Sequence, residues 1–170
     1  MSANIHPALA IIALGSNLGD PHQNLCDAMA RLQEFSDSRL LKSSVWRTTP
    51  VDCPPVSPQF LNAIVGLAPR SDETPETLLA KLQALEKAFG RGAKKVLNEP
   101  RPLDLDLIAF GGEKWKTVTL VLPHPRAAQR KFVLQPLSEI APHLILPGQT
   151  KTVAELLSAL QTDEVITRVD

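Results

Sequence analysis

The sequence "RPLDLDLIAF" at residues 101–110 places two aspartates inside a stretch that is otherwise typical of a buried β-strand. Three leucines alternate with Asp104 and Asp106. Because successive side chains of a strand point to opposite faces, the leucines share one face and the aspartates share the other. Aspartate is depleted in strands, and two like charges on one face repel each other. The pattern therefore indicates that the carboxylates have a function.

The composition is that of an ordinary globular protein, and we expect a single domain across residues 1–170. The 18 basic and 18 acidic residues cancel, which argues against a general nucleic-acid or anionic-membrane surface. Cys26 and Cys53 are far apart and have no zinc or CxxC spacing. The apolar run near the N-terminus is much shorter than a membrane span. We expect a cytoplasmic protein that binds neither nucleic acid nor membrane.

Strand-like and helix-like segments alternate along the chain. We expect strands at residues 8–14, 42–49 and 60–68 and within residues 101–110. Helices are predicted after Asp20-Pro21 and Thr74-Pro75, because each pair offers an N-cap followed by proline at the first helical position. The remaining predicted elements are a strand at residues 116–123, a short helix after Pro125 and a late helix at residues 152–160.

The order β-α-β-β-α-β predicts an α+β protein, a ferredoxin-like α/β sandwich with a mainly antiparallel sheet and helices packed on it. We expect the two main helices to cover one face of the sheet over a core of leucine, isoleucine and valine. The other face should then be free for polar chemistry, and the two aspartates are predicted to lie there.

Side chains two positions apart on one strand have Cα atoms about 6.5 Å apart, so Asp104 and Asp106 can converge on one cation or on two adjacent cations. Mg²⁺ prefers oxygen ligands and takes one or two protein carboxylates together with water and substrate phosphates. A bound divalent ion would also relieve the repulsion between the carboxylates. The alternative is a solvated strand face on which the two aspartates have no function.

Four cations precede the aspartates in a short segment that contains glycine: Arg91, Lys94, Lys95 and Arg101. Phosphoryl transfer requires positioning and neutralisation of charge, commonly by metal ions with arginine or lysine. A loop of this composition could close over a nucleotide, although a solvated turn would have the same composition. The sequence has neither a Walker A motif (GxxxxGKS/T) nor GxGxxG, which disfavours the common nucleotide-binding loops.

Two further positions carry side chains suited to ligand binding. His124 lies between two prolines in "LPHPR", close in sequence to Arg126 and Arg130, and could bind phosphate. Asn62 lies inside an apolar strand on the same face as Phe60, where an unpaired amide would cost about 1–3 kcal/mol. Such an amide either is satisfied within the core or reads the polar edge of a heterocycle on which an aromatic ring stacks.

Several motifs follow one another in order, among them "ALGSNLGD", "SSVWRTTPV", "PQFLNAIVGL", "PRPLDLDLIAFGG" and "LPHPR". In these motifs the chain resembles the 6-hydroxymethyl-7,8-dihydropterin pyrophosphokinases of folate biosynthesis, and the resemblance extends to about residue 147. It implies transfer of the β,γ-pyrophosphate of ATP to the hydroxymethyl group of the pterin, with release of AMP. It also implies a ferredoxin-like fold, in agreement with the order of elements.

The resemblance further implies which residues form the site. Asp104 and Asp106 match the ligands of two Mg²⁺ ions that bridge ATP and the pterin hydroxyl. Arg91 and Arg101 match the arginines of the catalytic loop. The positions that match the pterin site are Thr48, Val51, Phe60, Asn62 and Phe132. The positions that match the ATP site are Gln83, Glu86, Leu107, His124 and Arg130.

Three positions depart from better-known members of this family: Asn98, Ala93 and Pro125 replace a tryptophan, an arginine and an aromatic residue. The metal and pterin positions are intact, so we expect an active enzyme that works as a monomer on two small substrates. We also expect residues 90–101 to become ordered around the ATP phosphates. Two other hypotheses stay open: a non-catalytic ferredoxin-like module that binds a small heterocycle, and a different Mg²⁺-dependent phosphotransferase.

Overall fold

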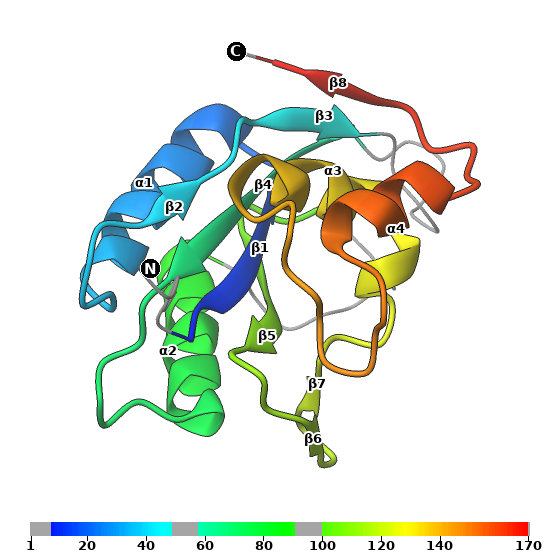
Figure 1. The fold of residues 1–170 in the computed structure, drawn as a ribbon. Coiled ribbons are helices and arrows are strands. Elements are labelled where there is room, and N and C mark those ends of the chain that lie inside the picture. The colour runs from blue at the N-terminus through cyan, green and yellow to red at the C-terminus, as the bar shows by residue number, and fades with distance from the viewer. Residues whose placement is uncertain (1–7, 49–57, 91–99, 170) are drawn as a thin grey trace.

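An antiparallel sheet of six strands runs through the centre of the molecule (Figure 1). The computed structural model describes residues 8–48, 58–90 and 100–169. The strands of the sheet are β1 (Ala10–Ser16), β2 (Leu41–Lys42), β3 (Trp46–Thr48), β4 (Phe60–Leu67), β5 (Asp104–Phe110) and β8 (Ile166–Arg168). Their order is β5-β1-β4-β3-β8, and β2 also pairs with β4. Every pairing among them is antiparallel, so the predicted α+β class is confirmed.

The two predicted main helices cover one face of this sheet (Figure 1). α1 (Pro21–Gln33) begins at Asp20, whose side chain caps the helix, and has proline at its first position. α2 (Pro75–Ala88) begins in the same way at Thr74. Leucines from both helices are completely buried against the leucines of the sheet. Burial of each such side chain contributes about 1.5–3 kcal/mol, so this layer is a main source of stability.

A second layer covers part of the opposite face (Figure 1). α3 (Lys131–Ile140) joins a core with Ile11, Ile64 and Ile108 of the sheet, and α4 (Val153–Ala159) packs against α3. α4 begins with the capping box that its sequence predicts. The expectation that this whole face is free for polar chemistry is therefore wrong. At this end the strands carry apolar residues on both faces, and both faces have to be covered.

Other segments differ from the sequence prediction in length. The predicted strand at residues 42–49 forms the two short strands β2 and β3. The predicted strand at residues 116–123 forms a separate hairpin of β6 (Trp115–Lys116) and β7 (Val121–Leu122). The short helix expected after Pro125 is a 3-10 turn, η1 (Ala127–Gln129), whereas the sequence pattern does not predict α3 or β8. Among the described residues, no helix has the length and apolar character needed to cross a membrane.

The pairing of β1 with β5 contains one irregularity. Ile12 lies opposite Leu107, but Ile11 lies opposite Ala109, so Ile108 is the extra residue of a bulge. Before the bulge the second face of β5 carries aspartates. From Ile108 onward it carries apolar side chains that pack in the second layer. The bulge therefore marks the boundary between the polar and the apolar part of this face.

Candidate active site

One row of residues crosses the end of the second face that lies outside the apolar core with α3. Gly15 of β1 lies between Asp104 of β5 and Asn62 of β4. Asn62 in turn lies opposite Trp46 of β3. Because paired residues of neighbouring strands point to the same face, the predicted metal ligand and the predicted pterin amide share one surface. Neighbouring strands lie about 4.8 Å apart, so these two positions are separated by roughly 10 Å.

Three carboxylates gather at this end of β5. Asp104 and Asp106 are half-buried, and Glu86 of α2 reaches the strand, where its Oε2 accepts a 2.8 Å hydrogen bond from the N–H of Leu105. Burial, and then the charges of Asp104 and Glu86, raise the pKa of Asp106 to about 7. Partial removal from water beside other carboxylates disfavours the charged form, and a bound cation would reverse this penalty.

Arg101 connects the carboxylates to the aromatic part of the surface. Its Nη2 lies 3.5 Å from Oδ2 of Asp104, and its guanidinium carbon lies 5.3 Å from the centre of the Phe60 ring. The side chain is 13% exposed, so both contacts are largely shielded from solvent. The predicted catalytic arginine therefore lies directly beside a predicted metal ligand and a predicted pterin contact.

Asn17 fixes the backbone at Arg101 and is a residue that the sequence analysis missed. Its Oδ1 accepts a 2.8 Å hydrogen bond from the N–H of Arg101, and its own N–H donates 3.1 Å to the Arg101 carbonyl. Its Nδ2 also donates 3.3 Å to the carbonyl of Pro58, just before β4. Only 2% of Asn17 is exposed. A polar residue directly after an apolar strand was the available signal, but its partners are distant in sequence.

The amide of Asn62 is held in a defined orientation. Its Nδ2 donates a 2.6 Å hydrogen bond to Oγ1 of Thr48, and both residues are buried. A methyl group at Gly15 would lie 3.0 Å from Oδ1 of Asn62 and 3.5 Å from the Phe60 ring. Because glycine stands there, no side chain from position 15 crowds Oδ1 of Asn62. Thr48, Phe60 and Asn62 are thus brought together, as the resemblance implies, and Gly15 is a further part of this site that the sequence analysis missed.

His124 and Arg130 border the carboxylates from the other side. The backbone N–H of His124 donates 2.8 Å to the carbonyl of Ile108, the bulge residue of β5. Its Nδ1 accepts a 3.2 Å hydrogen bond from the N–H of Arg126. Burial, and then the charges of Arg130 and Arg126, lower the pKa of His124. The Arg130 guanidinium lies 5.3 Å from the Phe132 ring centre, and its charge acts on Asp106 as well.

The remaining predicted positions are less closely associated with this surface. Gln83 is exposed on α2, and the side chain of Leu107 is buried in the leucine layer beneath α1 and α2. Only the backbone of Leu107 is therefore available to a ligand on the aspartate face. Arg91 and Val51 lie outside the described residues, as do Ala93 and Asn98.

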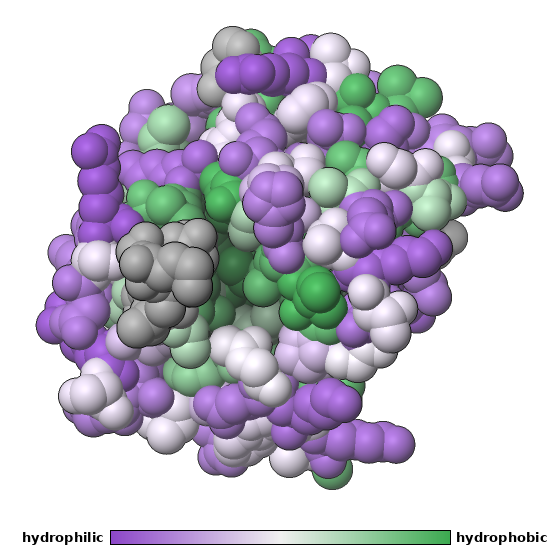
Figure 2. All heavy atoms as spheres, viewed as in Figure 1, coloured by the Kyte–Doolittle hydropathy of each residue, from purple (hydrophilic) through white to green (hydrophobic). Residues whose placement is uncertain are grey.

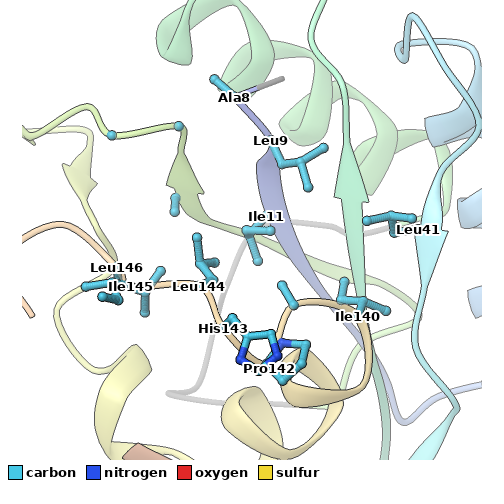
Figure 3. Close-up of a pocket in the computed structure, with 14 residues that line it drawn as sticks. Ala8, Leu9, Ile11, Leu41, Ile140, Pro142, His143, Leu144, Ile145 and Leu146 are labelled. Carbon is cyan, nitrogen blue, oxygen red and sulfur yellow. The ribbon is translucent and has the colours of Figure 1, made fainter. Parts of the chain in front are cut away.

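A cavity of about 700 Å³ lies at the other end of the same face, between the start of β1, the end of β5 and residues 140–146. Figure 2 shows hydrophobic side chains gathered in a hollow on this side, and Figure 3 shows Ile11, Ile140 and Leu144 around it. The volume is typical of a small-molecule pocket. None of the predicted site residues lines it, so we assign the candidate active site to the carboxylate end.

Known proteins share both the sequence and the fold. A family model for 7,8-dihydro-6-hydroxymethylpterin-pyrophosphokinase (HPPK) matches residues 11–142. A 2-amino-4-hydroxy-6-hydroxymethyldihydropteridine pyrophosphokinase of Synechocystis sp. is 36% identical over 156 residues, which are 92% of this chain and 78% of that protein. A Bacillus subtilis protein of the same name is 40% identical over 133 residues, which are 78% of this chain and 77% of that protein.

Among solved structures, an HPPK-DHPS protein in complex with substrates has a TM-score of 0.69 at 12% identity. The match covers 90% of this chain but only 43% of that chain, so this chain spans less than half of that protein. At this identity the similarity shows the fold alone, and it agrees with the ferredoxin-like sandwich.

The family model and the sequence relatives define the chain as an enzyme, a kinase that uses ATP as co-substrate. Within that class the sequence matches one family over most of its length. The chain belongs to the 7,8-dihydro-6-hydroxymethylpterin-pyrophosphokinase family.

Proposed function

We propose that the protein transfers the β,γ-diphosphate of ATP to the hydroxymethyl group of 6-hydroxymethyl-7,8-dihydropterin on the surface between Asp104 and Asn62. The pterin hydroxyl oxygen bonds to the β-phosphorus, and the bond from this phosphorus to the α,β-bridging oxygen breaks. AMP leaves with the bridging oxygen, and the hydroxyl proton passes to solvent. The observation that carries this proposal is the single row of Asp104, Gly15 and Asn62 on neighbouring strands. Arg101 lies beside Asp104 at one end of that row.

The donor set of the carboxylates fits a divalent cation. Asp104 and Asp106 supply hard oxygen ligands, and the pKa of Asp106, raised to about 7, reflects burial and crowding by like charges. In the described part of the chain, no group of three or more aspartate, glutamate, histidine or cysteine side chains is arranged so that it could hold a metal ion by itself. ATP phosphates and water would therefore complete the coordination. Mg²⁺ bound here would neutralise phosphate charge and orient the transferred group. We propose two ions.

The arginines supply the remaining positive charge. Arg101 lies beside Asp104 and Phe60. Its positive charge can stabilise the negative charge that develops during transfer of the diphosphate. Arg130 lies over the Phe132 ring, and its charge also acts on Asp106. His124, whose pKa is lowered, stays neutral at pH 7 and offers an Nε2–H to a phosphate oxygen, because Nδ1 already accepts from Arg126.

The pterin is proposed to bind at the Asn62 side of the row. The Thr48 hydroxyl orients the amide so that Oδ1 accepts from the ring edge. Phe132 and Phe60 supply aromatic surface for stacking. Val51 is also proposed for the pterin site, and Arg91 is proposed as the second catalytic arginine; both lie outside the described residues. We further expect the enzyme to work as a monomer in the cytoplasm.

The test is incubation with ATP, Mg²⁺ and the hydroxymethyl pterin, followed by ³¹P NMR. We expect AMP and a pterin diphosphate in equal amounts. ADP with a pterin monophosphate would instead show a different phosphotransferase. Binding of the pterin without any product would show a non-catalytic module. A double variant, Asp104→Asn with Asp106→Asn, serves as the inactive control.

A further inference from the structure

The C-terminal segment at residues 161–169 contacts both walls of the proposed pterin site. One wall is the start of α3, which carries Phe132, and the other is β3, which carries Thr48. These two residues are far apart in sequence. Figure 1 shows the segment leaving α4 and running beside β3. The segment lies beyond residues 11–142, the part matched by the family model.

The contact with α3 is made by the carboxylate of Glu164. Its Oε1 accepts a 3.4 Å hydrogen bond from the N–H of Lys131, and its Oε2 accepts a 3.3 Å hydrogen bond from the N–H of Phe132. These are the first two residues of the helix, whose N–H groups have no partner within the helix. The N-cap residue, Arg130, makes no side-chain cap. The carboxylate from the C-terminal segment therefore acts as the cap.

Glu164 is itself held in place. Its N–H donates 3.2 Å to the hydroxyl oxygen of Thr162, and this hydroxyl lies 3.5 Å from Oε1 of Glu164. A negative charge at a helix N-terminus is also favoured by the helix dipole. The arrangement orders the first turn of α3, and with it the backbone of the predicted stacking residue.

The contact with β3 is made by β8. Ile166 lies opposite Thr48, and Arg168 lies opposite Trp46. The N–H of Val169 also donates 2.9 Å to the carbonyl of Val45. Without β8, β3 would be an edge strand of only three residues. Pairing on its outer side stabilises the strand whose Thr48 hydroxyl orients the pterin amide.

We propose that Glu164 is a positioning residue for pterin binding, which acts through the backbone of Phe132 while β8 secures the opposite wall. This inference rests on the proposed function. It predicts that loss of the carboxylate weakens pterin binding more than ATP binding, because in the described structure Glu164 hydrogen-bonds the backbone of Phe132 and bonds to no side chain of a predicted metal ligand or ATP-site residue.

The test compares three variants by calorimetric binding of the pterin with a non-hydrolysable ATP analogue, and by steady-state kinetics. Glu164→Ala should raise the pterin Kd and KM about threefold to tenfold, as expected for the loss of a helix cap. The KM for ATP should stay within about twofold of wild type. Glu164→Gln keeps one acceptor oxygen, so its effect should lie between those of wild type and alanine, and it carries the test if the alanine variant does not fold.

Glu155→Ala is the matched control. Glu155 accepts a 3.0 Å hydrogen bond from the N–H of Thr152 at the start of α4, a helix with no predicted site residue. It should change thermal stability without changing pterin affinity. If Glu164→Ala matches this control in pterin affinity, or if the KM values for ATP and pterin rise equally, the positioning role is wrong. A wild-type protein that binds pterin and ATP but forms no pterin diphosphate would instead defeat the proposed function.

Discussion

The two ends of the second sheet face use the same three strands for different purposes. At one end Ile11, Ile64 and Ile108 are buried in a core with α3. At the other end, a few residues along the same strands, the row contains Asp104, Gly15 and Asn62. The first end contributes stability, and the second carries a charged residue, a glycine and an oriented amide. Stability and chemistry are thus separated along the strands and not only between the two faces of the sheet.

The bulge at Ile108 contributes to both ends. It keeps the aspartates and the isoleucine on one face while the strand changes register against β1. The carbonyl of Ile108 also accepts the hydrogen bond that anchors His124. Bulges of this kind re-aim side chains next to active sites. Because the apolar residues and the row with Asp104 occupy different positions along the strands, changes at the two ends should still have separable effects.

The largest effect is expected at the apolar end. Leu137 of α3 is completely buried, and Leu137→Ala removes packing from the second layer. We expect the free energy of unfolding, measured by urea denaturation, to fall by about 2–5 kcal/mol. KM values measured well below the melting temperature should stay unchanged, since Leu137 touches no proposed ligand. A large rise in KM would break the proposed separation of the two ends.

The corresponding change at the polar end is Asp106→Ala. We expect turnover to fall by at least ~10²-fold, because a metal ligand is lost. The fold should survive, since this half-buried carboxylate lies outside both cores. Steady-state kinetics with increasing Mg²⁺, together with circular dichroism, measure both quantities. Near wild-type turnover at saturating Mg²⁺ would remove Asp106 from the proposed metal site.

Asn62→Ala separates pterin binding from ATP binding within the polar end. The loss of the amide should weaken pterin binding by about 1–3 kcal/mol. ATP binding should change little, because Asn62 lies two strands away from the carboxylates. Calorimetric titration with each ligand gives both values. A loss of stability with unchanged pterin affinity would show that the amide only satisfies the core.

The smallest expected effect is the pH dependence of the free energy of unfolding of the metal-free protein. The pKa of Asp106 is raised from 3.8 to about 7 in the folded state, so the native state holds a proton that the unfolded chain releases. This contribution to stability is complete below the unfolded pKa and is lost as pH rises through about 7. Unfolding in urea with a chelator should therefore show a decrease of about 1 kcal/mol or more between pH 5 and pH 8. Asp106→Asn should remove this part of the decrease.

Local signals in the sequence predicted much of the fold. Asp20 and Thr74 are followed by proline and then by leucines at helical spacing, and both cap the expected helices. The alternation around Asp104 and Asp106 correctly assigned the leucines to a core face. α3 was missed because Pro136 lies within it. Proline is unfavourable inside a helix, and here burial of Val133, Leu134 and Leu137 outweighs that preference.

The parts of the site that depend on distant partners were not predictable from local patterns. Asn17 acts on Arg101, and Glu164 acts on Phe132, across long stretches of chain. Gly15 has its role only because the strand register places it in front of Asn62. A single sequence contains no direct signal for residue pairs that are this far apart along the chain. The resemblance to a family implied which residues form the site, but it did not imply the hydrogen bonds that position them.

The central claim, that the carboxylate end of the face binds the metal and its nucleotide, is tested most directly by paramagnetic broadening of amide NMR signals. Mn²⁺ replaces Mg²⁺ because both prefer carboxylate, water and phosphate oxygens, and a non-hydrolysable ATP analogue is present. We predict that the amide signals of residues 104–106 and Gly15 broaden first. The signals of Leu137 and of residues 140–146, which line the cavity at the other end of the face, should stay sharp. Strongest broadening at the distal end, or the same broadening in the Asp104→Asn and Asp106→Asn double variant, would contradict the account.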